Sequence, residues 1–136
     1  MAVRTKNCIL SVSALLIGAI LYILFRPYTY IAEIFKQFAW IAEIRKWIQP
    51  FSCNVVCFYL GDFLWMFALC SGFYAIFLPN RKECTIYLAG AALCGLTWET
   101  LQWSDIVTGT GDWIDIIMYV SACIASGIIN RKGNTK

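Results

Sequence analysis

Residues 95–119, GLTWETLQWSDIVTGTGDWIDIIMY, decide the predicted fold. Acidic side chains stand in this stretch at the end of one apolar segment and at the start of the next. The stretch contains no Lys, Arg or His, and carboxylates inside a membrane segment are costly and are commonly functional. It therefore predicts two membrane helices joined by a short loop, with their acidic ends brought together as the functional end of the protein.

The composition around this stretch is that of a membrane protein. The chain has 136 residues, of which 60% are hydrophobic and 14% charged, so we expect a single integral membrane domain over residues 1–136. A soluble domain of this size could not bury so much apolar surface. The net charge of the chain is only +3, and the basic residues flank apolar segments, which argues against nucleic-acid binding. The expected partner is membrane lipid.

The predicted fold class is all-α: a four-helix transmembrane bundle with one interfacial amphipathic helix between the first and second spans. The expected spans cover about residues 8–25, 58–78, 85–103 and 113–129. The first apolar run follows Arg4 and Lys6 and ends without a small-residue cleavage site, so it predicts a retained span rather than a signal peptide.

The amphipathic helix is expected over about residues 29–49. The segment IAEIFK at 31–36 returns as IAEIRK at 41–46, and the ten-residue shift presents the same helical face twice. Trp40 and Trp47 are expected at headgroup depth. Two interpretations stay open: this helix lies on lipid, or it packs on the bundle.

The distribution of basic residues predicts the orientation. Basic clusters stand at the N-terminus and after the second and fourth spans, which predicts that both termini lie in the cytoplasm. We expect the bundle to lie in the inner (plasma) membrane of the cell. Small residues spaced four apart, Ala91 with Gly95 and Ser121 with Ala125, predict close packing of the last two spans.

Five polar residues form the candidate ligand-binding cluster: Asp62, Glu99, Gln102, Asp112 and Asp115. Glu99 and Gln102 share a helical face, and a carboxylate at that depth needs a partner, for which Arg26 is the candidate ion-pair residue. Asp112 and Asp115 also suit an N-cap and a first helical turn, so capping and ligand binding are both open for them. The chain has seven Cys and no His, and we expect no metal, no cofactor and no catalytic residue.

These residues also carry a resemblance. Glu99-x-x-Gln102, a short loop and Asp112-x-x-Asp115 at a helix start resemble the VanZ-like family of small bacterial membrane proteins, over roughly residues 55–129. The sequence departs from that pattern at Gly109–Gly111, where an Arg is common, and at Tyr119 and Ala122, where Asn and Gly are common. The resemblance implies an envelope protein associated with low-level resistance to the glycopeptide teicoplanin.

Three functions follow as hypotheses. The first is a non-enzymatic protein whose outward-facing acidic pocket binds a cationic or hydroxyl-rich group of a lipid-linked envelope precursor or a glycopeptide, with Glu99 as main acceptor and Gln102 orienting it. The second is a structural or accessory membrane subunit. The third is a small metal-dependent membrane enzyme that acts on a lipid-linked substrate.

Overall fold

The computed structural model describes residues 2–25, 38–48, 54–107 and 111–131. Within these ranges the chain forms five helices and no strand, in the order α1 (Ala2–Phe25), α3 (Ala39–Ile48), α4 (Asn54–Phe77), α5 (Arg81–Trp103) and α6 (Trp113–Arg131). The all-α fold class is thereby confirmed for the described residues. Arg26 and residues 29–37 and 49 of the expected amphipathic helix lie outside them.

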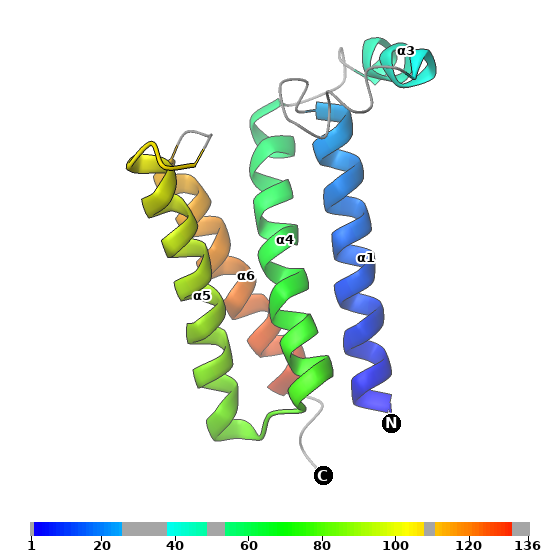
Figure 1. Ribbon diagram of the computed structural model, residues 1–136. Coiled ribbons are helices and arrows are strands. Elements are labelled where there is room, and N and C mark those ends of the chain that lie inside the picture. The colour runs from blue at the N-terminus through cyan, green and yellow to red at the C-terminus, as the bar shows by residue number, and fades with distance from the viewer. Residues whose placement is uncertain (1, 26–37, 49–53, 108–110, 132–136) are drawn as a thin grey trace.

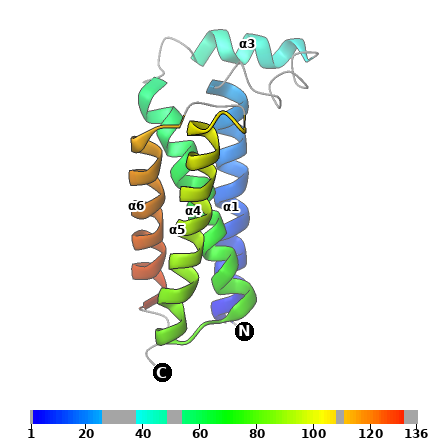
Figure 2. The ribbon, with the colours of Figure 1, turned by 60° about the vertical axis from the view of Figure 1, so that its left-hand side comes forward.

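Four of the helices run side by side along one axis, and α3 lies across one end of this bundle (Figures 1 and 2). Helix α4 is central and packs against α1 and α6, while α5 packs against α6 and α4. Because neighbours along the chain alternate in direction, α1 begins and α6 ends at the same end of the bundle (Figure 1).

Three of the described helices are long and apolar enough to cross a membrane: Val3–Phe25, Tyr59–Phe77 and Trp113–Asn130. Their outward faces carry large exposed hydrophobic side chains such as Ile9, Ile76 and Ile124. The predicted span 85–103 lies in α5, which has 23 residues but is less apolar and is not among the three. The chain is thus an all-helical protein with three candidate membrane spans in its described part.

Helix α5 begins four residues before the expected span because of a capping box. The Asn80 side chain accepts hydrogen bonds from the backbone N–H groups of Lys82 and Glu83, and Glu83 accepts one from the Asn80 backbone N–H. This reciprocal arrangement satisfies donors that would otherwise be unpaired at the helix start. The charged residues at 81–83 therefore form the first turn of α5.

Small side chains form the centre of the packing. Ala91 of α5 and Ala122 of α6 are fully buried, in a core that also contains Met66, Phe67 and Cys70 of α4. The expected small-residue face of the last span is displaced by one position. Ser121 and Ala125 are only partly buried, whereas Ala122 and Ser126 are fully buried. The reason is that Tyr119, which shares the face of Ala122 and Ser126, is the side chain that α6 turns into the bundle.

Helix α3 exposes its described side chains unevenly. Ile41 is 4% exposed, whereas Trp40 is 59% and Trp47 78% exposed. The Arg45 guanidinium donates hydrogen bonds to the backbone carbonyl of Ile23, near the last turn of α1. A cation at a helix C-terminus satisfies terminal carbonyls and interacts favourably with the helix dipole, so Arg45 connects α3 to α1.

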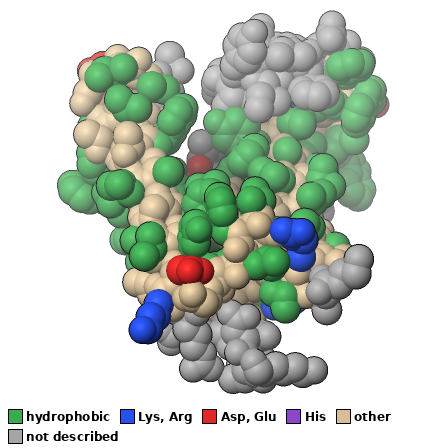
Figure 3. All heavy atoms as spheres, turned by 60° about the horizontal axis from the view of Figure 1, so that its bottom comes forward, with side chains coloured by type: hydrophobic (Ala, Val, Ile, Leu, Met, Phe, Trp, Pro, Cys, Tyr) green, Lys and Arg blue, Asp and Glu red, His purple; other side chains and the backbone are tan. Residues whose placement is uncertain are grey.

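The opposite end of the bundle carries Arg4, Lys6 and Lys82 and is called the basic end below. Here too, cationic side chains donate hydrogen bonds to carbonyl groups near helix C-termini. Arg4 Nε donates to the carbonyl oxygen of Ala75 at 3.1 Å, and Lys6 Nζ donates to that of Ile129 at 3.2 Å. Figure 3 is turned toward this end and shows Lys and Arg side chains among hydrophobic ones. The basic N-terminal flank therefore holds the last turns of α4 and α6, in addition to its predicted role in orientation.

Candidate functional site

The predicted site residues lie at the end of the bundle away from the N-terminus, here called the acidic end and defined by Asp62, Glu99, Asp112 and Asp115. Asp62 belongs to the first half of α4, Glu99 to the last turn of α5, and the other two aspartates to the start of α6. Since α5 runs toward this end and α4 and α6 run away from it, the topology brings all three helices together there (Figure 1).

Glu99 is the best-buried residue of the acidic end, with 1% of its surface exposed. Its Oε1 accepts a hydrogen bond from the Tyr119 hydroxyl at 2.9 Å, and its Oε2 accepts one from the backbone N–H of Asp112 at 3.1 Å. A carboxylate can be buried only if its oxygens find donors. Both donors come from α6 or its N-terminus, so Glu99 fastens the end of α5 to the start of α6.

Asp112 is the N-cap of α6 and also contacts α4. Its Oδ1 accepts from the backbone N–H of Ile114 at 3.0 Å, and its Oδ2 accepts from the Tyr59 hydroxyl at 2.9 Å. These two donors, the backbone N–H first, hold the pKa of the Asp112 carboxyl below its usual value. The capping role predicted for Asp112 is confirmed, and the Tyr59 contact adds a connection to α4 that capping alone does not require.

Gly95 makes the Glu99–Tyr119 contact sterically feasible. A Cβ atom on Gly95 would lie 2.6 Å from Cδ2 of Tyr119 and 2.7 Å from Cε of Met66. Gly95 precedes Glu99 by four residues, so both lie on the face of α5 that meets α6. The missing side chain lets the Tyr119 ring lie against the α5 backbone, where its hydroxyl reaches the Glu99 carboxylate.

Asp62 and Asp115 belong to the same cluster. Both are partly buried, and Asp115 lies in the first turn of α6. Their negative charges act on the hydroxyl groups of Tyr59 and Tyr119, which already contact Asp112 and Glu99. Four carboxylates and two tyrosine hydroxyls are therefore gathered at the acidic end.

Gln102 is placed differently from the expected orienting role. Its side chain is partly exposed and forms no hydrogen bond with the described residues, while its backbone carbonyl accepts from the N–H of Asp105 at 3.1 Å. Next to it, the Trp103 ring packs on Gly111, whose Cβ would lie 2.1 Å from Trp103 Cδ1, and on the Trp113 ring at 4.6 Å between centroids. The residues that hold Glu99 are Tyr119 and Asp112.

Sequence reasoning missed both tyrosines. Tyr59 was assigned only to the start of a span, and Tyr119 was noted only as a departure from a family pattern. A signal was present for Tyr119, because it follows Asp112 by seven residues and Asp115 by four and so shares their helical face. For Tyr59, no sequence spacing relates it to Asp112, which is 53 residues away.

The carboxylates of the acidic end are negatively charged hydrogen-bond acceptors. Such a cluster attracts cations and hydroxyl or ammonium donors. Among the described residues, no three His, Cys, Asp or Glu side chains are placed to bind one metal ion. Comparison of the chain with protein-family models, with curated protein sequences and with solved structures finds no match.

Proposed function

We propose that the chain is a multi-pass membrane protein of VanZ-like type that crosses the membrane four times, with α5 as the additional span. The 23 residues of α5 correspond to about 35 Å at ~1.5 Å per residue, which exceeds the ~30 Å of a hydrocarbon core. The hydroxyls of Thr97 and Thr100 donate to carbonyls one turn earlier at 2.8 Å, which removes their need for water. Ile86 and Leu93 present exposed apolar surface.

In this proposal the basic end faces the cytoplasm of the cell's inner (plasma) membrane and the acidic end faces outward. The basic flank and Lys82 support this orientation because basic residues favour the cytoplasmic side, whereas α3 places Arg45 and Lys46 at the outward end. On α3, the exposed Trp40 and Trp47 suit a position at the lipid headgroups.

The function we propose is recognition of a cationic or hydroxyl-rich group at the acidic end. The observation that carries it is the burial of Glu99, whose two oxygens fix α5 to α6 and so gather the surrounding carboxylates. The contacts suggest a division of roles that differs from the sequence hypothesis. Glu99 organises the cluster, while Asp62 and Asp115 add negative charge that attracts the ligand.

The resemblance to VanZ-like proteins suggests the class of ligand. A lipid-linked envelope precursor and a glycopeptide both carry hydroxyl groups, and a glycopeptide such as teicoplanin also carries an amine. Binding of teicoplanin at the outer face would lower its access to its target and give low-level resistance.

The test is the teicoplanin susceptibility of a bacterial host that expresses the wild-type chain, Glu99→Gln or Glu43→Gln at matched membrane levels. Glu43 is an exposed carboxylate on α3, so its substitution is a control for the same chemical change away from the cluster. We expect protection by the wild type and Glu43→Gln and loss of protection by Glu99→Gln. Absence of protection by the wild type would reject the resistance function.

A second candidate function is that of a structural or accessory subunit, and the occupied oxygens of Glu99 favour it. If Glu99 serves only to join helices, Glu99→Gln lowers stability, whereas Asp62→Asn and Asp115→Asn leave function unchanged. If the acidic end binds a ligand, both aspartate variants lose protection at wild-type stability. Unfolding and susceptibility measured on the same variants separate the two functions.

A further inference from the structure

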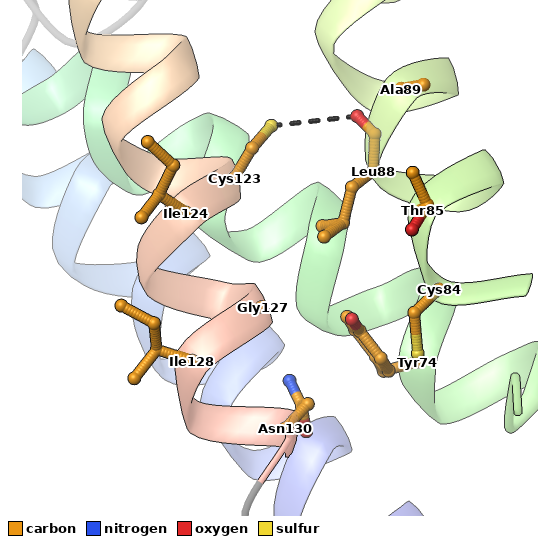
Figure 4. Close-up of a pocket in the computed structure, with 10 residues that line it drawn as sticks. All are labelled: Tyr74, Cys84, Thr85, Leu88, Ala89, Cys123, Ile124, Gly127, Ile128 and Asn130. Carbon is orange, nitrogen blue, oxygen red and sulfur yellow. Dashed lines mark hydrogen bonds between the residues drawn. The ribbon is translucent and has the colours of Figure 1, made fainter. Parts of the chain in front are cut away.

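A groove opens between α5 and α6 near the basic end, far from the acidic cluster. It encloses about 670 Å³, within the ~300–1,000 Å³ range of small-molecule sites. Leu88 and Ala89 of α5 and Cys123, Ile124, Gly127 and Ile128 of α6 line it. In Figure 4, Cys123 and Gly127 face α5, while the Ile124 and Ile128 side chains point to the outer side of α6. We call this feature the α5–α6 groove.

The floor of the groove is formed where α5 and α6 approach each other closely. Gly127 lines it, and a Cβ there would lie 3.2 Å from Cδ1 of Leu88, so the Leu88 side chain packs directly on the α6 backbone. On the α5 side, Ala89 is small and exposed. The walls are apolar and belong to helices whose outward faces are apolar, so the groove suits a hydrocarbon chain from the surrounding bilayer.

The polar groups of the groove are concentrated at one end. Asn130, in the last turn of α6, lies with Tyr74 and Cys84 at the lower end of Figure 4, while Thr85, in the second turn of α5, lies higher, beside Leu88. Asn130 is 5% exposed, and its Nδ2 donates to the carbonyl oxygen of Ser126 at 2.9 Å. Its Oδ1 is buried and has no hydrogen-bond partner among the described residues. This acceptor requires an O–H or N–H donor.

Positive charge flanks the polar end of the groove. Lys6 Nζ donates to the carbonyl oxygen of Ile129, the residue before Asn130. Lys82 is exposed one helical turn before Thr85, at the start of α5. Figure 3 shows Lys and Arg side chains on this end of the molecule. An anionic group at this end of the molecule would be attracted by both cations.

We propose that the α5–α6 groove binds an anionic phospholipid with a hydroxyl-bearing headgroup, of the phosphatidylglycerol class. One acyl chain lies along the open side of the groove, against Ala89 and Ile124. The phosphate lies at the mouth, between Lys6 and Lys82. A headgroup hydroxyl donates a hydrogen bond to Asn130 Oδ1, which explains why this acceptor is buried without a protein partner.

The experiment measures lipids retained by the purified full-length chain by native mass spectrometry. The chain is exposed to equimolar phosphatidylglycerol and phosphatidylcholine with identical acyl chains. Ala89→Leu narrows the groove, whereas Gly90→Leu adds the same side chain one residue later, at a position with no atom within 4 Å of the added Cβ. We expect the wild type and Gly90→Leu to retain phosphatidylglycerol preferentially, and Ala89→Leu to lose at least three-quarters of it.

A second pair of variants tests the two ends of the lipid separately. Gly127→Leu fills the groove from α6 and should remove both lipids. Asn130→Leu should leave acyl-chain binding intact and reduce the preference for phosphatidylglycerol at least threefold. Circular dichroism of each variant verifies folding, and Ala89→Leu on the exposed wall remains informative if Gly127→Leu fails to fold. Equal retention of the two lipids by the wild type, or unchanged retention by folded Ala89→Leu, would overturn the proposal.

Discussion

Two glycines of α5 allow a direct test of the close approach between α5 and α6. Gly95 faces Tyr119 and Met66, and Gly90 has no atom within 4 Å of an added Cβ. Both lie in the interior of the same helix, so Gly→Ala brings the same gain in helix propensity at each position. That gain is about 1 kcal/mol.

The two positions differ in what the new methyl group meets. Cε of Met66 is the end of a flexible side chain and can move, but the Tyr119 ring is buried and held by its hydrogen bond to Glu99. Overpacking of this kind costs about 1–3 kcal/mol. We therefore expect Gly90→Ala to stabilise the protein by up to ~1 kcal/mol. Gly95→Ala should be less stable than Gly90→Ala by about 1–3 kcal/mol.

The assay is the free energy of unfolding in a mild detergent, measured by titration with a denaturing detergent and followed by far-ultraviolet circular dichroism. The reasoning predicts opposite effects, with stabilisation at position 90 and little change or destabilisation at position 95. Stabilisation of the same size by both variants would refute the close contact between Gly95 and Tyr119.

Three further predictions concern hydrogen bonds near the ends of the helices. Tyr119→Phe removes a hydrogen-bond donor to the buried Glu99 carboxylate and should lower the free energy of unfolding by about 1.5–3 kcal/mol. Tyr59→Phe should lower it less, because the acceptor Asp112 is less buried than Glu99. An equal loss of stability in the two variants would contradict these contacts. The lowered pKa of Asp112 stabilises the fold above the unfolded value of about 3.9, and this contribution disappears as the pH falls through the folded value. The stability difference between the wild type and Asp112→Asn, which retains a capping side chain, should therefore shrink between about pH 5 and pH 2, and a difference that is constant with pH would contradict it. Asn80→Ala should cost about 0.5–2 kcal/mol by removing the cap of α5, and unchanged thermal unfolding would argue against the capping box.

The helices were predictable because apolar run length and helical spacing are local properties of the sequence. The capping role of Asp112 was predictable for the same reason, since an Asp after Gly111 at the start of an apolar run is a local signal. The start of α5 at Arg81 is not visible in the apolar run because residues 81–83 are charged, although Asn80 and Glu83 have the spacing of a capping box.

The partners of Glu99 were not predictable from local patterns. The sequence suggests Gln102, whereas the described residues that donate to Glu99 are Tyr119 and, through its backbone N–H, Asp112. Arg26, the suggested ion-pair residue, lies outside the described residues. Which residue reaches a buried carboxylate depends on the rotation of α6 about its axis. That rotation is set by Gly95, which leaves room for the Tyr119 ring, and it appears only when the helices are packed.

The most direct test of the proposed recognition at the acidic end is calorimetric titration of teicoplanin into the purified chain. The wild type is compared with the double variant Asp62→Asn/Asp115→Asn, which retains Glu99 and its contacts. We predict saturable binding by the wild type and at least tenfold weaker binding by the double variant at unchanged thermal stability. Absence of saturable binding by the wild type, or equal affinity of the two proteins, would contradict the assignment of the acidic end as a binding site.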